Sequence, residues 1–245
     1  GQMKNQTDWA LAFGVTNFIF HTFQHQPLGD DALPGMAMGP HGSNWHRHQN
    51  WWNMLPAYHD YISRSSYLLQ QGVTVSDILY LTPEGVPHIF WPPIDALSGK
   101  GLLKDKRGYG FDATSPRILI NQATVQDGHI VFKNASRYKI MILPDSDTMT
   151  PETLEQIIYF VENGATIVGN PPFKSPSLSN YPNSDRRVIE LATRLWGNLE
   201  LPSSLTKRSF GKGTIYWGQD IYDKDDDSEE FYPSYANTAS LLQAI

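Results

Sequence analysis

Residues 73–245 alternate between short apolar runs and amphipathic stretches, and this alternation constrains the fold more than any other feature. The runs DILYL (77–81), KIMIL (139–143) and ATIV (165–168) are apolar apart from Asp77, Lys139 and Thr166. Strands buried on both faces of a parallel sheet have this composition. The helical stretches between them would cover the two faces. The sequence therefore predicts an α/β domain with a doubly wound, open parallel sheet and right-handed crossovers.

Local signals mark the helices and turns of this domain. Thr150-Pro151-Glu152 opens one helix, with a capping threonine, proline at the first position and an acid near the positive end. Asp127-Gly128 predicts a hairpin turn. Further helices are predicted at 55–71, 115–122, 184–196 and 235–245, hairpins at 125–132 and 208–217, and an insertion at 92–114.

The first sixty residues follow a different pattern. Ala12–Phe20 predicts a short connection into a buried strand, and His21, His25 and Gln26 follow that strand directly. Polar side chains at the C-terminal end of a strand are how an α/β barrel builds its active site. We therefore expect residues 1–60 to be the remnant of a (β/α)8 barrel from a larger enzyme. A strand without partners has open edges, so residues 12–23 should pair with the second domain, pair with another copy, or pack as irregular chain.

Composition excludes several classes of function. A net charge of −6 and a pI near 5.7 argue against nucleic acid as a partner. The sequence has no apolar run of the length that crosses a membrane. It has no cysteine, which excludes a cysteine nucleophile, cysteine-ligated zinc and iron–sulfur clusters.

Four long strings carry a resemblance to a known family. They are GVTNFIFHTFQHQP (14–27), PGMAMGPHGSNWHRHQNWW (34–52), YISRSSYLLQQGVTVSDILYLTPEG (61–85) and YKIMILPDSDTMTPETLEQIIYFVENGATIVGNPP (138–172). In this order they resemble the C-terminal part of the α-L-rhamnosidases of glycoside hydrolase family 106. The resemblance covers nearly the whole chain. It implies the last strand of a catalytic barrel at 1–60, followed by a flavodoxin-like or amidotransferase-like α/β/α domain at 61–245.

The resemblance also implies a chemistry for the parent enzyme. It implies an inverting glycosidase that uses two carboxylates, binds calcium and removes terminal α-L-rhamnose from plant-type polysaccharides. The family's nearest glutamate is expected before Trp9, where this chain has none. We therefore assign no catalytic residue, metal ligand or cofactor to the chain itself and expect it to be inactive alone. A bacterial, periplasmic or secreted parent is expected, and homo-oligomerisation stays open.

Among residues 1–60 the expected sugar contacts are His21, His25, Gln26, Trp45 and His46. Histidine and amide side chains can hydrogen-bond to sugar hydroxyls, and tryptophan can stack on a sugar face. The structural alternative is that both histidines are buried and satisfied, and that Trp51 and Trp52 hold the start of the following helix to a core, with Trp45 left open. Asp30-Asp31 is interpreted as a solvated turn rather than an acid/base pair.

Two acidic features lie in the second domain. Glu84 would stand at the C-terminal edge of the first strand, where doubly wound sheets often bind ligands. Its alternatives are a helix cap or an interdomain hydrogen bond. The run DKDDDSEE (223–230) predicts a solvated acidic loop, because Ser228 and Ser234 replace the glycine and glutamate of a calcium-binding loop.

Two classes of function remain. The first is a fragment of a carbohydrate-active glycoside hydrolase. The second is a non-catalytic structural or oligomerisation module attached to a glycosidase barrel. Amidotransferase chemistry is excluded because it needs a cysteine nucleophile. Flavin-phosphate binding is disfavoured because Pro83 removes an amide donor from the turn after the first strand.

Overall fold

The fold is described from a computed structural model, which covers residues 2–85, 90, 108–222 and 232–245. Contacts within the chain divide it into two compact units, residues 1–74 and 75–245. The boundary expected after residue 60 falls within helix α2 (Leu55–Leu69) of the first unit. Across the described ranges, no helix is both long and apolar enough to cross a membrane.

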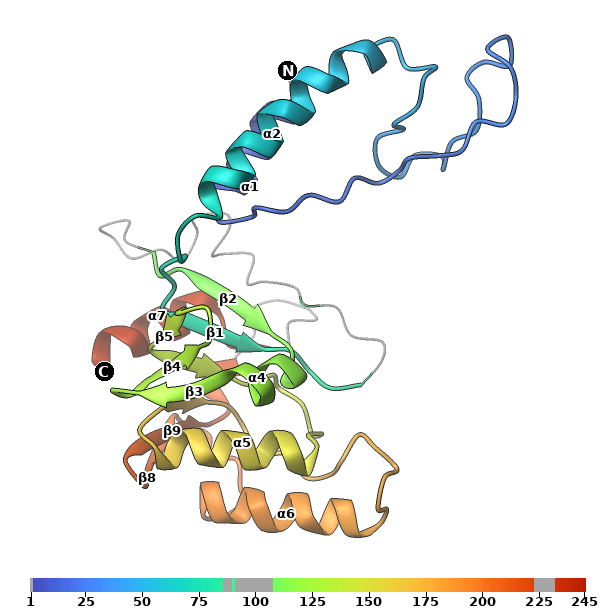
Figure 1. Cartoon of the computed structure of the whole chain (residues 1–245). Coiled ribbons are helices and arrows are strands. Elements are labelled where there is room, and N and C mark those ends of the chain that lie inside the picture. Colours follow the sequence, from blue (N-terminus) through green and yellow to red (C-terminus); the bar gives the residue numbers. More distant parts are fainter. Residues whose placement is uncertain (1, 86–89, 91–107, 223–231) are drawn as a thin grey trace. The chain divides into compact units, whose positions relative to one another are not determined.

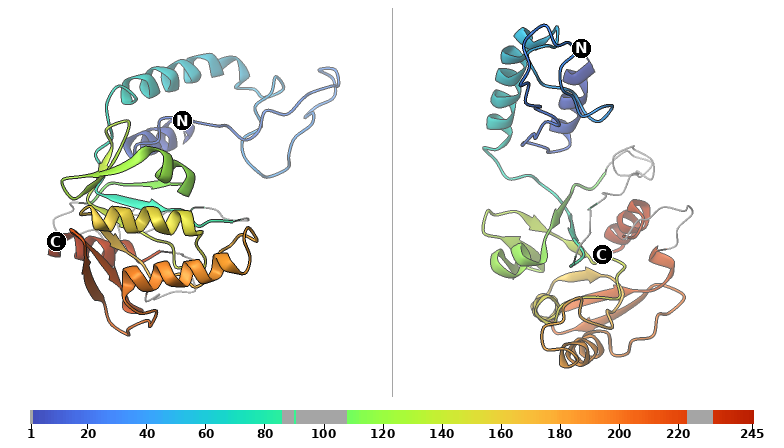
Figure 2. Two further views of the ribbon diagram at one scale, coloured as in Figure 1. Left: turned by 60° about the horizontal axis from the view of Figure 1, so that its bottom comes forward. Right: turned by 90° about the vertical axis from the view of Figure 1, so that its right-hand side faces the viewer.

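The first unit is built on two neighbouring helices, α1 (Gln2–Ala12) and α2, which lie side by side in Figures 1 and 2. The Tyr61 hydroxyl of α2 donates to Asp8 of α1 at 2.5 Å, and Lys4 donates to the same carboxylate. The Thr7 and Tyr58 hydroxyls are 2.5 Å apart. Leu11 of α1 and Ile62 of α2 are buried. A short 3-10 helix, η1 (Trp52–Met54), leads into α2.

The buried strand expected over Ala12–Phe20 is wrong. Ala12 is the last residue of α1, and residues 15–20 have no regular structure. The Ile19 side chain is 94% exposed and that of Phe23 is 76% exposed. The physical reason is that an extended run becomes a strand only when another strand satisfies its backbone groups. Residues 15–20 are irregular chain, and the backbone pairing near this segment is made by His21 and Thr22, which hydrogen-bond to Ser43 and Trp45.

The second unit contains a six-stranded sheet in the order β2-β1-β6-β7-β9-β8. Five strands are parallel, and β8 pairs antiparallel with β9 as the edge. If the five parallel strands are numbered from one to five along the chain, their order in the sheet is 2-1-3-4-5, as in flavodoxin-like sheets. The α/β fold expected from the apolar runs is confirmed. The strands are β1 (Ile78–Leu81), β2 (Phe111–Thr114), β6 (Ile140–Ile142), β7 (Thr166–Val168), β8 (Thr206–Phe210) and β9 (Gly213–Trp217).

Helices cover both faces of this sheet, because the side chains of each strand alternate between them. Leu79 and Leu81 pack in the cluster that includes α5 (Pro151–Glu162) and α6 (Asn183–Trp196). Ile78 and Tyr80 pack in the cluster that includes α7 (Tyr235–Ala244). Figure 1 shows α5 and α6 together on one side of the strands and α7 on the other. The result is a three-layer α/β/α unit.

A small antiparallel sheet lies between β2 and β6 in the sequence. It contains β3 (Ala123–Gln126), β4 (His129–Phe132) and β5 (Arg137–Tyr138), and it follows α4 (Pro116–Gln122). Asp127 and Gly128 both have positive φ, 49° and 74°, as the predicted hairpin turn requires. Strand β2 was not predicted and lies in the expected insertion. A second 3-10 helix, η2 (Asp220–Tyr222), follows β9.

Candidate functional site

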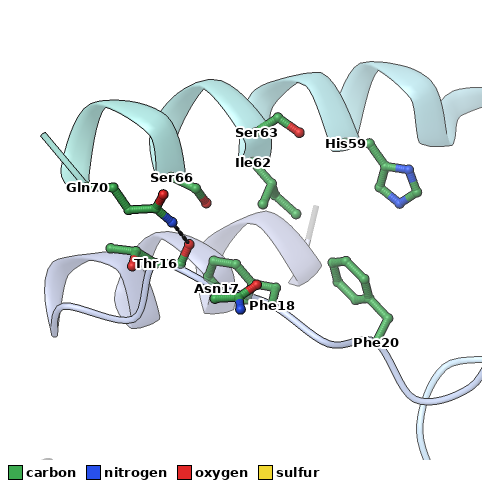
Figure 3. Close-up of a pocket in the computed structure, with 9 residues that line it drawn as sticks. All are labelled: Thr16, Asn17, Phe18, Phe20, His59, Ile62, Ser63, Ser66 and Gln70. Carbon is green, nitrogen blue, oxygen red and sulfur yellow. Dashed lines mark hydrogen bonds between the residues drawn. The ribbon is translucent and has the colours of Figure 1, made fainter.

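A groove of about 400 Å³ runs along α2 in the first unit (Figure 3). One wall is residues 16–20, and the other is one face of α2. Phe20 and His59 stand together at one end of the groove, with ring centroids 5.8 Å apart. At the other end the Gln70 amide donates to the Thr16 carbonyl at 3.0 Å. The lining residues are Thr16, Asn17, Phe18, Phe20, His59, Ile62, Ser63, Ser66 and Gln70.

Arg47 organises the loop that contains the predicted sugar contacts. Its guanidinium donates to the Leu28 carbonyl at 2.7 Å, to the Gln26 carbonyl at 3.2 Å and to the Asp30 carboxylate at 2.7 Å. Asp30 also lies 3.3 Å from His48 Nε2. Both partners favour the charged carboxylate, and Arg47 has the larger effect, so the pKa of Asp30 lies below its usual value. Arg47 thus ties residues 26–30 to residues 47–48.

The three predicted sugar contacts that follow Phe20 differ in their exposure to solvent. His21 and His25 are exposed to solvent. Gln26 is half-buried, and its side-chain amide pairs with the Met36 backbone, with distances of 2.6 Å and 2.8 Å. Gly35 has a φ of +83°, which favours glycine, and a Cβ there would lie 2.2 Å from Gln26 Oε1 and displace the amide. The Gln26 amide is therefore used within the loop, whereas both histidines face water.

Trp45 and His46 are both buried, with 5% and 3% of their surfaces exposed. The Trp45 ring lies 4.3 Å from Phe20 and 5.4 Å from His59, measured between centroids. His46 Nδ1 accepts the His48 backbone N–H at 3.3 Å. Burial lowers the pKa of His46, and the positive charges of His48 and Arg47 add to the effect. These contacts favour the packing interpretation of both residues.

The carboxylates of the first unit are poorly suited to act as a general acid. A general acid in a glycosidase needs a raised pKa, which burial among apolar groups provides. The pKa of Asp8 is instead lowered, because Lys4 and Tyr61 donate hydrogen bonds to it. The pKa of Asp30 is lowered in the same direction. Asp31 and Asp60 are exposed.

In the second unit, Glu84 follows β1 at the C-terminal edge of the sheet. Its carboxylate accepts the Thr150 backbone N–H at 2.6 Å, the Thr150 hydroxyl at 2.8 Å and the Thr153 hydroxyl at 2.8 Å. These groups form the N-terminus of α5, which Thr150 also caps through the Thr153 N–H. Glu84 therefore acts as an additional helix cap at this edge.

Two tyrosines occupy the ends of the neighbouring strands β1 and β6. The Tyr232 hydroxyl donates to the Leu81 carbonyl at 2.8 Å, and the Tyr222 hydroxyl donates to the Leu143 carbonyl at 3.2 Å. Burial raises the pKa of each phenol. The order of strands reverses between β1 and β6, which is where doubly wound sheets usually bind ligands. Here side chains of the same unit fill that place.

Sequence reasoning missed the groove along α2. His59, Ser63, Ser66 and Gln70 recur at spacings of four, three and four, so they share one face of the helix. That periodicity could have indicated the groove, because it places a row of polar side chains on α2 next to the buried Ile62. The extended course of residues 16–20 carried no comparable signal.

The acidic run 223–230 lies outside the described residues. Within the described ranges, no three or more His, Asp or Glu side chains gather in a way that could hold a metal ion.

Comparison with known proteins finds similarity over most of the chain. Residues 1–235 match the model of a glycoside hydrolase family, family 106, described as alpha-L-rhamnosidase. A Formosa agariphila protein named "Putative beta-glucuronidase" is 38% identical over 198 residues, which are 80% of this chain. The rhamnosidase structure from Novosphingobium sp. PP1Y aligns with 97% of this chain, with a TM-score of 0.59 and 27% identity.

The matched region is a small part of both relatives. The alignment covers 16% of the Formosa agariphila protein and 20% of the Novosphingobium rhamnosidase chain.

Proposed function

The chain belongs to the α-L-rhamnosidase family of glycoside hydrolases, family 106, and on this premise we propose that it is the C-terminal part of a larger enzyme that hydrolyses terminal α-L-rhamnosides. One observation carries the proposal: the family match spans residues 1–235, while the chain spans a fifth or less of the relatives' length. The proposed substrates are rhamnose-containing glycans, and plant-type polysaccharides are the expected source.

We propose inversion as the stereochemical course, as the family resemblance implies. Inversion needs one protonated and one ionised carboxyl, about 6.5–9.5 Å apart, with water between them. Asp8 and Asp30 are held ionised by their partners, so neither is a suitable proton donor. The catalytic pair would therefore come from the rest of the larger enzyme, and the 245-residue chain would not hydrolyse glycosides. Calcium would likewise take its ligands from outside the described residues.

The experiment compares the isolated chain with the product of the complete reading frame that contains it. Both are assayed with 4-nitrophenyl α-L-rhamnopyranoside and with 4-nitrophenyl β-D-glucuronide, because one relative is named for the second activity. We expect the complete enzyme to release nitrophenol from the rhamnoside, and the isolated chain to release none above the blank. The anomer that forms first, observed by proton NMR, tests inversion. Turnover by the isolated chain would overturn the proposal.

A second function, as a non-catalytic structural module, is favoured for residues 75–245 in particular. The observation is that Glu84, Tyr222 and Tyr232 fill the C-terminal edge of the sheet with contacts inside the unit. We propose that this unit supports the catalytic part without touching substrate. The substitution Glu84→Gln in the complete enzyme should then lower its thermal stability and leave KM for the rhamnoside unchanged. A changed KM with unchanged stability would contradict this role.

A further inference from the structure

We propose that the groove along α2 binds one neutral sugar ring. Its volume of about 400 Å³ falls within the range of small-molecule sites. The groove is contained in the first unit, where α2 supplies one wall and residues 16–20 the other (Figure 3). It lies apart from the predicted contacts His21 and His25, neither of which lines it.

An aromatic wall closes one end of the groove. The rings of Phe20 and His59 are inclined by 29°, and Trp45 packs against both. Because Trp45 is 5% exposed, it fixes the two rings from the buried side. A pyranose ring has an apolar C–H face of similar size, and such a face packs well on a rigid aromatic surface. Phe18 and Ile62 extend the apolar surface into the groove.

Polar groups along the walls suit a ligand with many hydroxyls. Ser63 and Ser66 can each donate and accept a hydrogen bond, and Asn17 offers an amide. The Gln70 amide nitrogen is held by the Thr16 carbonyl, which directs the side chain along the groove. A sugar hydroxyl also both donates and accepts, so it can pair with any of these groups.

The lining has no carboxylate, ammonium or guanidinium group; its one titratable side chain is His59. A charged ligand would lose its hydration without gaining an opposite charge, which is costly. The groove should therefore prefer a neutral sugar over a uronate or a sugar phosphate. The choice of carbohydrate among neutral, hydroxyl-rich molecules rests on the proposed function, whereas the shape and neutrality of the groove do not.

The test titrates the 245-residue chain with methyl α-L-rhamnopyranoside and, separately, with sodium methyl β-D-glucuronide, observing saturation-transfer NMR and calorimetry. A single ring should bind the chain with a dissociation constant on the order of 1–10 mM. The uronate should bind roughly tenfold more weakly or not at all. No saturable binding of the rhamnoside would overturn the proposal, and so would preference for the uronate.

Two substitutions on neighbouring α2 residues locate the site. Ser63→Phe puts a ring into the groove from an exposed position, so the fold should survive and sugar binding should be lost. Arg64→Phe adds the same ring at an exposed residue outside the lining and should leave binding unchanged. Equal binding by the two variants would place the sugar elsewhere and reject the groove.

The complete enzyme separates failure of this proposal from failure of the proposed function. If it hydrolyses the aryl rhamnoside and the isolated chain binds no sugar, the groove proposal fails alone. The isolated chain could bind the sugar while the complete enzyme shows no binding that depends on Ser63. Another segment would then cover the groove in the complete enzyme, and the proposal would be rejected. If the complete enzyme hydrolyses no rhamnoside but the chain binds the sugar through Ser63, the groove stands and the proposed function fails.

Discussion

Glu84 and Thr150 are joined twice, because one carboxylate accepts both the backbone N–H of Thr150 at 2.6 Å and its hydroxyl at 2.8 Å. Glu84 and Thr150 are 66 residues apart in sequence, and their contact connects the segment after β1 to the start of α5. A carboxylate at this position satisfies amide groups that a helix leaves unpaired and interacts favourably with the helix dipole.

Replacing Glu84 by alanine should destabilise the second unit by about 1–3 kcal/mol, because three donors at a partly buried helix end lose their acceptor. Hydrogen exchange at the α5 amides measures this change. The control is Glu152→Ala, an exposed acid in the first turn of the same helix. Its cost should be about 0.3–1 kcal/mol. Equal protection factors in the two variants would show that the Glu84 contacts contribute nothing specific.

Acid should loosen the loop around His46. Burial holds the pKa of His46 in the folded chain below the ordinary histidine value of about 6.5. The unfolded loop therefore binds a proton more readily, so stability is complete above about pH 6.5 and is lost as pH falls through the folded pKa. Tryptophan fluorescence between pH 8 and pH 5 should report the change, since Trp45 is adjacent. His46→Gln should flatten this dependence, whereas His25→Gln, at an exposed position, should keep it.

Loss of the Arg47 guanidinium should release residues 26–30. Arg47→Lys retains a positive charge but cannot reach two carbonyls and a carboxylate at once. Both Arg47→Lys and Arg47→Ala should therefore be cleaved faster by proteinase K within residues 26–36. Arg64→Ala, on the exposed surface of α2, provides the comparison. Wild-type cleavage rates in the lysine variant would mean that charge alone holds the loop.

The buried hydroxyl of Tyr222 should contribute to the stability of the second unit. Tyr222→Phe leaves the buried Leu143 carbonyl without its donor, which should cost about 1–3 kcal/mol of unfolding free energy. Tyr159→Phe is the matched control, because the Tyr159 side chain is 42% exposed and its hydroxyl makes one long contact of 3.4 Å. Urea titration followed by circular dichroism compares the two variants.

The second unit could be predicted because its signals are local. Apolar runs such as KIMIL, the Thr150-Pro151 helix start and the Asp127-Gly128 turn each identify an element without knowledge of its neighbours. Strand β2 escaped notice because its sequence, FDAT, is short and half polar, and it becomes a strand through its register with β1. Pairing of that kind is non-local and leaves little trace in four residues.

The first unit was predicted less well for a related reason. Phe18, Ile19 and Phe20 form an apolar run of the kind found in a buried strand, but residues 15–20 have no regular structure in this chain. The sequence did not predict which side chains of residues 21–46 are buried. Trp45 and His46 are buried, whereas His21 and His25 are exposed. Trp45 packs on Phe20 and His59, and these are tertiary contacts that no spacing rule indicates.

Strand β8 has a consequence at high protein concentration. Without it the sheet would end at β9, whose residues Gly213–Trp217 include Ile215, Tyr216 and Trp217 and would offer an apolar template to other molecules. With it, the final edge carries the exposed Lys207, while Arg208 donates to the carbonyls of Arg194 and Leu195 at the end of α6. Two such edges brought together would confront cation with cation, which discourages ribbon growth. We therefore expect the hairpin to oppose edge-to-edge association of the sheet.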